Sequence, residues 1–158
     1  EIESRFLVNE SFEAFVNVGL LDAEYDGFIA DLDGANAEGL VEPTNNDYLT
    51  PKYAPEMTAS FGGTYTADLG DGELQLFAKY SFVDELYSIT DNRDVGKVPS
   101  TEKIDASITF LKDNYKISLF GRNLTDEITS PVRDISSLMI FGSPSVGTVY
   151  GITLSANF

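Results

Sequence analysis

The fold is decided by the stretch Val149-Tyr150-Gly151-Ile152-Thr153-Leu154-Ser155-Ala156-Asn157-Phe158, in which apolar and polar side chains alternate. Every second residue from Tyr150 onward is apolar or aromatic, and the residues between them are small or polar. A helix would space its apolar residues three and four positions apart, whereas a strand points alternate side chains to opposite faces. The stretch therefore predicts a strand with one apolar face.

Six segments upstream show the same alternation, the first of them least regularly. Their apolar sets are Ile2, Phe6 and Val8; Phe12, Ala14, Val16, Val18 and Leu20; Met57, Ala59, Phe61 and Tyr65; Leu74, Leu76, Ala78, Tyr80 and Phe82; Ile104, Ala106, Ile108 and Phe110; and Tyr115, Ile117 and Leu119. Together with the last stretch they predict roughly seven strands of about 9–11 residues, which is the length that crosses a bilayer at a tilt.

The connections between these strands alternate strictly between tight and long. Tight turns fall at residues 9–11, 69–72 and 112–114, and long loops run from Asp22 to Pro55, from Asp84 to Thr101 and from Leu124 to Gly147. Outer-membrane barrels have short periplasmic turns and long extracellular loops, whereas soluble domains prefer short connections throughout. The pattern predicts an all-β, antiparallel, up-and-down transmembrane β-barrel whose last strand runs inward, so that the C-terminus is periplasmic.

The second face of these strands carries polar residues that suit a water-filled lumen: Glu13, Lys79, Asp105, Lys116, Ser118 and Arg122. Aromatic residues near the strand ends fit the girdle found at both membrane interfaces: Tyr65, Tyr80, Phe82, Phe110, Tyr115, Tyr150 and Phe158. Because unpaired backbone groups are not tolerated in hydrocarbon, seven strands with two open edges cannot form a complete barrel. We therefore expect residues 1–158 to be the C-terminal portion of a larger barrel, an expectation that the lack of an initiator Met or signal peptide supports.

The composition excludes several classes of function. The chain has 26 acidic and 10 basic residues and a formal charge of −16, which argues against binding nucleic acid. It has no Cys and no His, so it offers neither the usual nucleophile–base pairs nor Cys or His metal ligands. Asp31-x-Asp33-Gly34 is weakly similar to a calcium loop, but the later bidentate Glu is missing. We expect no enzyme, no cofactor and no metal site.

Two motifs near the C-terminus resemble one protein family. Ile117-Ser118-Leu119-Phe120-Gly121-Arg122-Asn123-Leu124-Thr125-Asp126-Glu127 resembles the penultimate strand of TonB-dependent outer-membrane receptors, and residues 150–158 resemble their last strand. Residues 17–25 and 53–56 resemble an earlier strand and the start of the next. The resemblance implies a 22-stranded barrel with a plugged lumen. This chain would supply about its last seven strands, and the plug domain and N-terminal strands would lie outside it.

The resemblance also implies a function and a set of partners. These receptors import a scarce ligand across the outer membrane of Gram-negative bacteria, often a ferric siderophore, and take energy from the TonB complex through their N-terminal region. The implied partners are therefore an iron chelate or other small ligand, TonB, outer-membrane lipid and lipopolysaccharide. The barrel-assembly machinery would read the terminal signal Tyr150, Ile152, Leu154, Ala156 and Phe158. A passive porin-like channel and a soluble or surface β-sandwich adhesion module remain alternatives, since a sandwich also alternates apolar and polar residues.

Five residues are candidates for ligand contact. Arg122 and Lys79 could line a ligand path and attract an anionic ligand, or could pair with lumenal acids such as Asp105 or with the plug. The loop aromatics Tyr25, Tyr48 and Phe141 could stack on an aromatic ligand, or could pack within the loops. Asn123 and Thr125 are instead expected to bond locally to the backbone where the strand ends.

Overall fold

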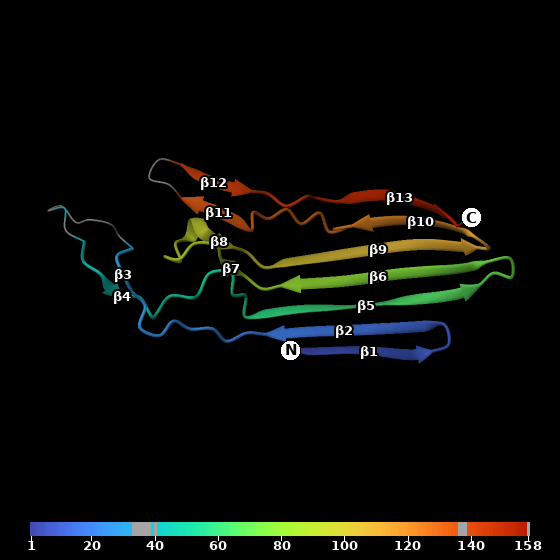
Figure 1. Cartoon of the computed structure of the whole chain (residues 1–158), viewed down its shortest axis with the longest axis horizontal. Helices are drawn as coiled ribbons and strands as arrows, with labels where there is room; N and C mark the ends of the chain where they lie inside the picture. The colour runs from blue at the N-terminus through green and yellow to red at the C-terminus, as the bar shows by residue number, and fades with distance from the viewer. Residues whose placement is uncertain (33–38, 40, 136–138, 158) are drawn as a thin grey trace.

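A computed structural model describes residues 1–32, 39, 41–135 and 139–157 of the chain. One antiparallel sheet of seven strands dominates it, and each strand pairs with its neighbours in chain order (Figure 1). The strands are β1 (Ile2–Asn9), β2 (Phe12–Leu20), β5 (Met57–Asp68), β6 (Glu73–Val83), β9 (Thr101–Lys112), β10 (Tyr115–Arg122) and β13 (Val149–Ala156). The prediction of seven antiparallel up-and-down strands is confirmed.

The long loops gather at one end of the sheet and the tight turns at the other (Figure 1). Each long loop contains a small hairpin: β3 (Ile29–Ala30) with β4 (Thr44–Asn45), β7 (Leu86–Tyr87) with β8 (Lys97–Val98), and β11 (Val132–Ile135) with β12 (Ile140–Ser143). A short 3-10 helix, η1 (Asp94–Gly96), precedes β8. Sequence reasoning missed these elements because strands of two to four residues are too short to show a period. No helix in the described part of the chain is long and apolar enough to cross a membrane.

The strand register places all the predicted apolar sets on the same face of the sheet. One row across it runs Val16–Phe61–Tyr80–Ile104, and the next rows repeat the pattern. These side chains are exposed rather than packed: Phe61 is 53% and Ile152 67% accessible. The rows are therefore not the core of a sandwich, and the soluble-sandwich alternative is wrong on this point.

A buried hydrophobic core is nearly absent from the described residues. Only Leu49 and Val98 are buried apolar residues there, and both lie in the loop region rather than in the large sheet. Monomeric soluble proteins rarely expose a continuous apolar surface of several strands. The apolar face thus has the character expected of a surface in contact with lipid.

Polar residues mark the upper and lower limits of this apolar face on β9. Glu102 and Lys112 share the face with Ile104 and Phe110, and stand ten positions apart. At about 3.3 Å per residue they are separated by about 33 Å along the strand. A tilt of about 40° reduces this to about 25 Å along the membrane normal, which is the height of the apolar band in transmembrane barrels.

The opposite face is polar and cross-linked by side-chain hydrogen bonds. The Asn17 Nδ2 group donates to Ser60 Oγ (3.1 Å), and the hydroxyl oxygens of Thr109 and Ser118 lie 2.8 Å apart. This composition fits a wall of an aqueous lumen, as predicted.

Glycine is required where two aromatic rings cover this polar face. The rings of Phe15 and Phe77 stack with their centroids 6.4 Å apart, and Phe15 is the register partner of Gly62. A Cβ atom at Gly62 would overlap the carbonyl oxygen of Ala78 and lie 2.9 Å from Phe15 Cζ. The Phe15 ring thus packs directly on the Gly62 backbone, and a larger residue at position 62 would displace the ring.

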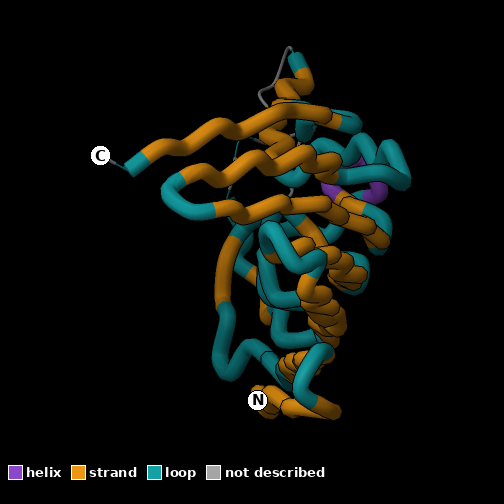
Figure 2. The backbone as a smooth tube through the Cα atoms, turned by 90° about the vertical axis from the view of Figure 1, so that its right-hand side faces the viewer, coloured by secondary structure: helices purple, strands orange, loops and turns teal. Residues whose placement is uncertain are grey.

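The sheet is strongly twisted. Seen after a quarter turn, the strands near the N-terminus point toward the viewer while those near the C-terminus run across the picture (Figure 2). Right-handed twist that accumulates from strand to strand, together with strand tilt, is what allows such a sheet to close into a barrel.

Candidate ligand-binding site

The segment that follows β10 fastens the loop end of the sheet. Asn123 adopts a left-handed backbone conformation (φ 52°), and its side chain is buried. Its Nδ2 group donates to the carbonyls of Glu127 (2.9 Å) and Val146 (3.0 Å), and its Oδ1 accepts from the Glu127 N–H (3.0 Å). The prediction of local side-chain to backbone bonds at Asn123 is confirmed.

The same segment ties three strands together. The Thr125 hydroxyl donates to the Glu102 carbonyl in β9 (2.8 Å). Just before β13, the Thr148 hydroxyl donates to the Asn123 carbonyl (2.7 Å), and the Thr148 N–H donates to Asp126 Oδ1 (2.9 Å). The Asn-Leu-Thr-Asp motif, which carried much of the family resemblance, therefore serves structure rather than ligand contact.

A cleft of about 650 Å³ opens between the two halves of the first long loop, and we call it the acidic cleft. This size lies within the range of small-molecule sites. No Lys or Arg is among its lining residues, which are Leu21, Asp22, Ala23, Glu24, Tyr25, Asp47, Tyr48, Leu49, Thr50, Ala54 and Glu56. The wall therefore combines four carboxylates with two tyrosine rings.

Three consecutive polar residues, Asn45 to Asp47, hold the loop beside the acidic cleft, and Asp47 lines the cleft itself. The buried Asn46 side chain donates to the carbonyls of Ala30 (2.9 Å) and Thr44 (2.8 Å), which joins the two ends of the β3–β4 hairpin. Asp47 Oδ1 accepts from the Phe28 N–H (2.6 Å), and Asp47 Oδ2 accepts from Asn45 Nδ2 (2.9 Å). The Phe28 N–H is the main reason that the pKa of the Asp47 carboxyl lies below its ordinary value.

The two tyrosines that the sequence singled out in this loop line the same cleft. Tyr25 is half-buried, and its ring lies 4.5 Å from that of Phe28, centroid to centroid. Tyr48 is 80% exposed and is thus free to meet a ligand. Their convergence from positions 23 residues apart could not be seen in the sequence.

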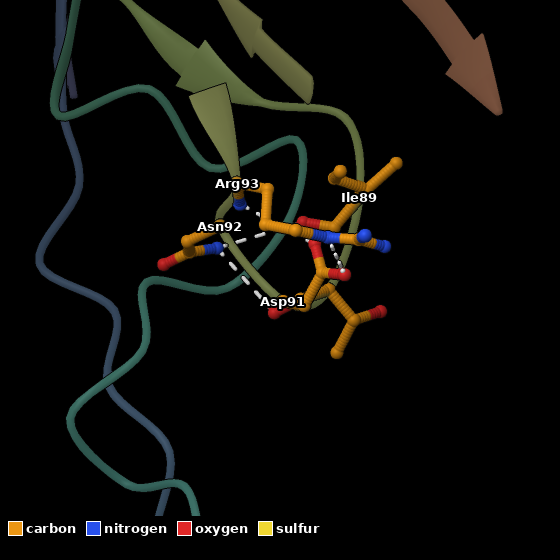
Figure 3. A network of polar contacts seen from close by, with 5 residues as sticks. Ile89, Asp91, Asn92 and Arg93 are labelled. Atoms are coloured by element: carbon orange, nitrogen blue, oxygen red, sulfur yellow. Dashed lines mark hydrogen bonds and ion pairs between the residues drawn. The ribbon is translucent and has the colours of Figure 1, made fainter. Parts of the chain in front are cut away.

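Tyr48 and Leu49 also line a second, smaller cavity of about 220 Å³, whose other walls come partly from the next long loop. Asp91 and Arg93 of that loop face this cavity and form an ion pair (Figure 3). The sequence gives no reason to expect Arg93, which belongs to the long loop from Asp84 to Thr101, near Tyr48.

The remaining candidate residues lie elsewhere. Lys79 lies in the middle of β6 on the polar face, as the register partner of Asp105, and Arg122 lies at the loop end of β10. The Arg122 guanidinium stands 5.3 Å from the centre of the Phe120 ring. Asp105 accepts the Asn123 N–H (2.8 Å), and no ion pair within the described residues involves Lys79 or Arg122.

Phe141 and the terminal signal complete the predicted set. Phe141, on β12, is 56% exposed and does not line the acidic cleft. Tyr150, Ile152, Leu154 and Ala156 project from one exposed face of β13. Phe158, and Asp33 and Gly34 of the calcium-like segment, lie outside the described residues.

No protein-family model matches the chain. Among solved structures, the crystal structure of the ferric yersiniabactin uptake receptor FyuA from Yersinia pestis matches with a TM-score of 0.77 at 16% sequence identity. The match covers 99% of this chain and 22% of that chain, so the chain spans about a fifth of the length of the receptor. At this identity the likeness establishes the fold: a segment of a receptor barrel, as the sequence predicted. The matched protein is an uptake receptor and not an enzyme.

Proposed function

We propose that the chain is the C-terminal portion of the barrel of a TonB-dependent receptor that imports a scarce ligand across a bacterial outer membrane. The observation that carries the proposal is the exposed apolar face of a seven-strand meander, bounded by polar residues about 25 Å apart along the membrane normal. The fold shared with an uptake receptor over nearly the whole chain supports it.

The two edges of the sheet support a larger barrel. Within the described residues β1 pairs only with β2, and β13 pairs only with β10. Edges cannot remain unpaired in hydrocarbon, so further strands complete the ring. In the 22-stranded receptors these strands and a plug domain precede the portion described here, and the plug region contacts TonB.

The orientation follows from the unequal connections. The long loops, which hold the acidic cleft, face the outside of the cell, and the tight turns and C-terminus face the periplasm. In this arrangement lipid and lipopolysaccharide cover the apolar face. The alternating residues Tyr150, Ile152, Leu154 and Ala156 of β13, with Phe158, form the signal for the barrel-assembly machinery.

The ligand is a small molecule captured from outside, with ferric siderophores as the first class to test. Tyr25 and Tyr48 make the first contacts in the acidic cleft, where rings can stack on an aromatic ligand. Phe141 contributes from the third loop, and Lys79 and Arg122 act deeper, on the polar wall. Because Tyr48 is mostly exposed, its removal should lower ligand affinity without lowering barrel stability.

Growth of a strain lacking the intact parent gene, on single iron sources, tests this function. One ferric chelate should fail to support growth, and the wild-type gene should restore it. The Tyr48→Ala variant should reach the membrane at wild-type level and take up that chelate with at least a severalfold weaker half-saturation. If the deletion strain takes up every chelate normally, the iron ligand is wrong; if the parent protein is monomeric and soluble without detergent, the membrane assignment fails.

A further inference from the structure

Asn92 joins the first two long loops through its side chain. Its Oδ1 accepts the Thr50 N–H (2.6 Å), and its Nδ2 donates to the Thr50 carbonyl (3.0 Å). One amide side chain thus satisfies both backbone groups of a residue 42 positions away, as a neighbouring strand would. Figure 3 shows the turn that presents it, between Asp91 and Arg93. Asn92 has a φ of 52°, a conformation that Asn tolerates better than most residues.

A second backbone bond joins the same two loops. The Tyr53 N–H donates to the Tyr87 carbonyl (2.8 Å), three residues beyond Thr50. Tyr53 also has a left-handed backbone (φ 58°), which turns the chain toward this partner. The segment from Thr50 to Tyr53 is therefore held at both ends by the second loop.

The second long loop is itself held by internal hydrogen bonds and packing, so it can hold the Thr50–Tyr53 segment in place. Its buried Ser88 donates to the Gly96 carbonyl through both its N–H (2.8 Å) and its hydroxyl (3.0 Å). A Cβ atom at Gly96 would overlap the side chain of Ile89, so the turn closes without spare room. Val98, which follows in β8, is 4% exposed and is one of the two buried apolar residues in the described part of the chain.

The segment that Asn92 holds begins within the wall of the candidate ligand site, because Thr50 itself lines the acidic cleft. Tyr48 and Leu49, which line both the acidic cleft and the smaller cavity, immediately precede Thr50. The far wall of the smaller cavity comes from the two residues on either side of Asn92. The position of Asn92 therefore sets both the distance between the loops and the placement of the Tyr48 wall.

We propose that Asn92 is a positioning residue that locks residues 48–53 of the first long loop to the second long loop, so that the cavities on both sides of Tyr48 form one rigid capture surface. The two loops then move as a single body. The role of this body in ligand capture rests on the proposed function, whereas the locking itself does not. Without the lock, Tyr48 would have to be ordered at the moment of binding, which lowers affinity.

Hydrogen exchange of the intact parent protein in lipid nanodiscs tests the lock with no ligand. Asn92→Gly keeps the left-handed backbone but removes both bonds to Thr50, and with them the two longer contacts of Asn92 Nδ2 to the carbonyls of Ile89 (3.5 Å) and Thr90 (3.4 Å) in its own turn. Exchange of peptides spanning 48–53 should therefore accelerate about tenfold. Asn92→Asp keeps the acceptor for the Thr50 N–H and should accelerate exchange only about threefold. Asn114→Ala, in the tight turn at the opposite end of the sheet, is the matched control and should change nothing there.

Hydrogen exchange at the Tyr53 amide distinguishes a lock between the two loops from an effect of Asn92 on its own turn alone. If Asn92 only orders its own turn, exchange at Tyr53 stays at the wild-type rate in Asn92→Gly; if it locks the loops, Tyr53 exchange accelerates with Thr50. Unchanged thermal unfolding of the barrel shows that the variant folds. Wild-type exchange throughout 48–53 in Asn92→Gly overturns the inference.

Uptake of a panel of ferric chelates then distinguishes this inference from the proposed function. With the lock and the function both correct, Asn92→Gly imports the accepted chelate with a half-saturation raised severalfold, and Asn92→Asp restores part of the loss. If wild-type cells import no chelate better than the deletion strain, the proposed function fails. The hydrogen-exchange result still shows whether Asn92 locks the two loops together. If Asn92→Gly shows fast exchange but wild-type uptake, the capture role is refuted.

Discussion

Replacing Ile108 by Arg tests whether the apolar face contacts lipid. Ile108 projects from that face of β9, six positions from Glu102 and four from Lys112, and is 52% exposed. With the same rise and tilt as above, it lies about 15 Å below one polar boundary and about 10 Å above the other, close to the bilayer midplane. An Arg at the midplane of a transmembrane barrel costs about 2–4 kcal/mol. The folding equilibrium should therefore fall by about 30- to 700-fold.

Ser107→Arg is the matched control, one residue away at the same depth. Ser107 projects from the polar face, where its register partners Phe77 and Phe120 offer ring faces to a guanidinium. Ser107→Arg should lower the free energy of unfolding by less than about 1 kcal/mol, since lumen positions are hydrated. Guanidinium-induced unfolding of the full-length barrel in phospholipid vesicles measures both changes. Equal costs for the two variants, or a larger cost for Ser107→Arg, would refute the assignment of faces.

Three further outcomes follow from single side chains. Asn123→Ala removes the side-chain donor to the part-buried carbonyls of Glu127 and Val146 and should lower barrel stability by about 1–2 kcal/mol, measured by the same unfolding experiment. Gly62→Val forces a branched side chain against the backbone of β6 and should reduce the assembled fraction in the outer membrane; wild-type assembly would contradict the packing argument. Because its pKa is lowered by the Phe28 N–H, the Asp47 carboxylate contributes stability to the loop above the ordinary pKa of 3.8, and this contribution is lost as pH falls through the lowered value. Proteolysis within residues 28–32 and 41–47 should therefore become faster as pH falls below 3.8, and in Asp47→Asn it should lose this pH dependence; wild-type cleavage that does not vary with pH would contradict this reasoning.

The large sheet could be predicted because alternate residues of a strand point to opposite faces, so the sequence of each strand shows which face is apolar. Ile152 and Thr153 fall on opposite faces by geometry alone, whatever the rest of the chain does. The same rule excludes register slips of one residue, which would exchange the apolar and polar faces, but the residue pairing itself was not predicted. The prediction therefore held for elements that are long and have chemically different sides.

The loops could not be predicted because their order comes from single long-range bonds. The bond between Asn92 and Thr50 spans 42 residues and leaves no periodic trace. From the sequence, residues 45–47, Asn-Asn-Asp, predict only a turn; the sequence does not show that the Asn46 side chain bonds to the Ala30 carbonyl beside the acidic cleft. Tyr25 and Tyr48 were singled out one by one as loop aromatics that could contact a ligand, but only the fold brings them to one cleft.

The proposed ligand residues fall into two groups that differ in charge: two tyrosines in an acidic cleft, and two basic residues on the polar wall of the sheet. The acidic cleft presents four carboxylates beside Tyr25 and Tyr48 and no basic side chain, so an anionic chelate meets repulsion there. On the polar wall of the sheet, the proposed ligand residues Lys79 and Arg122 would attract the same anion. The two groups cannot favour one highly charged ligand equally. A ligand handed from the loops to the wall must therefore carry little net charge or bind the loops through its apolar rings, with charge recognised only at the wall.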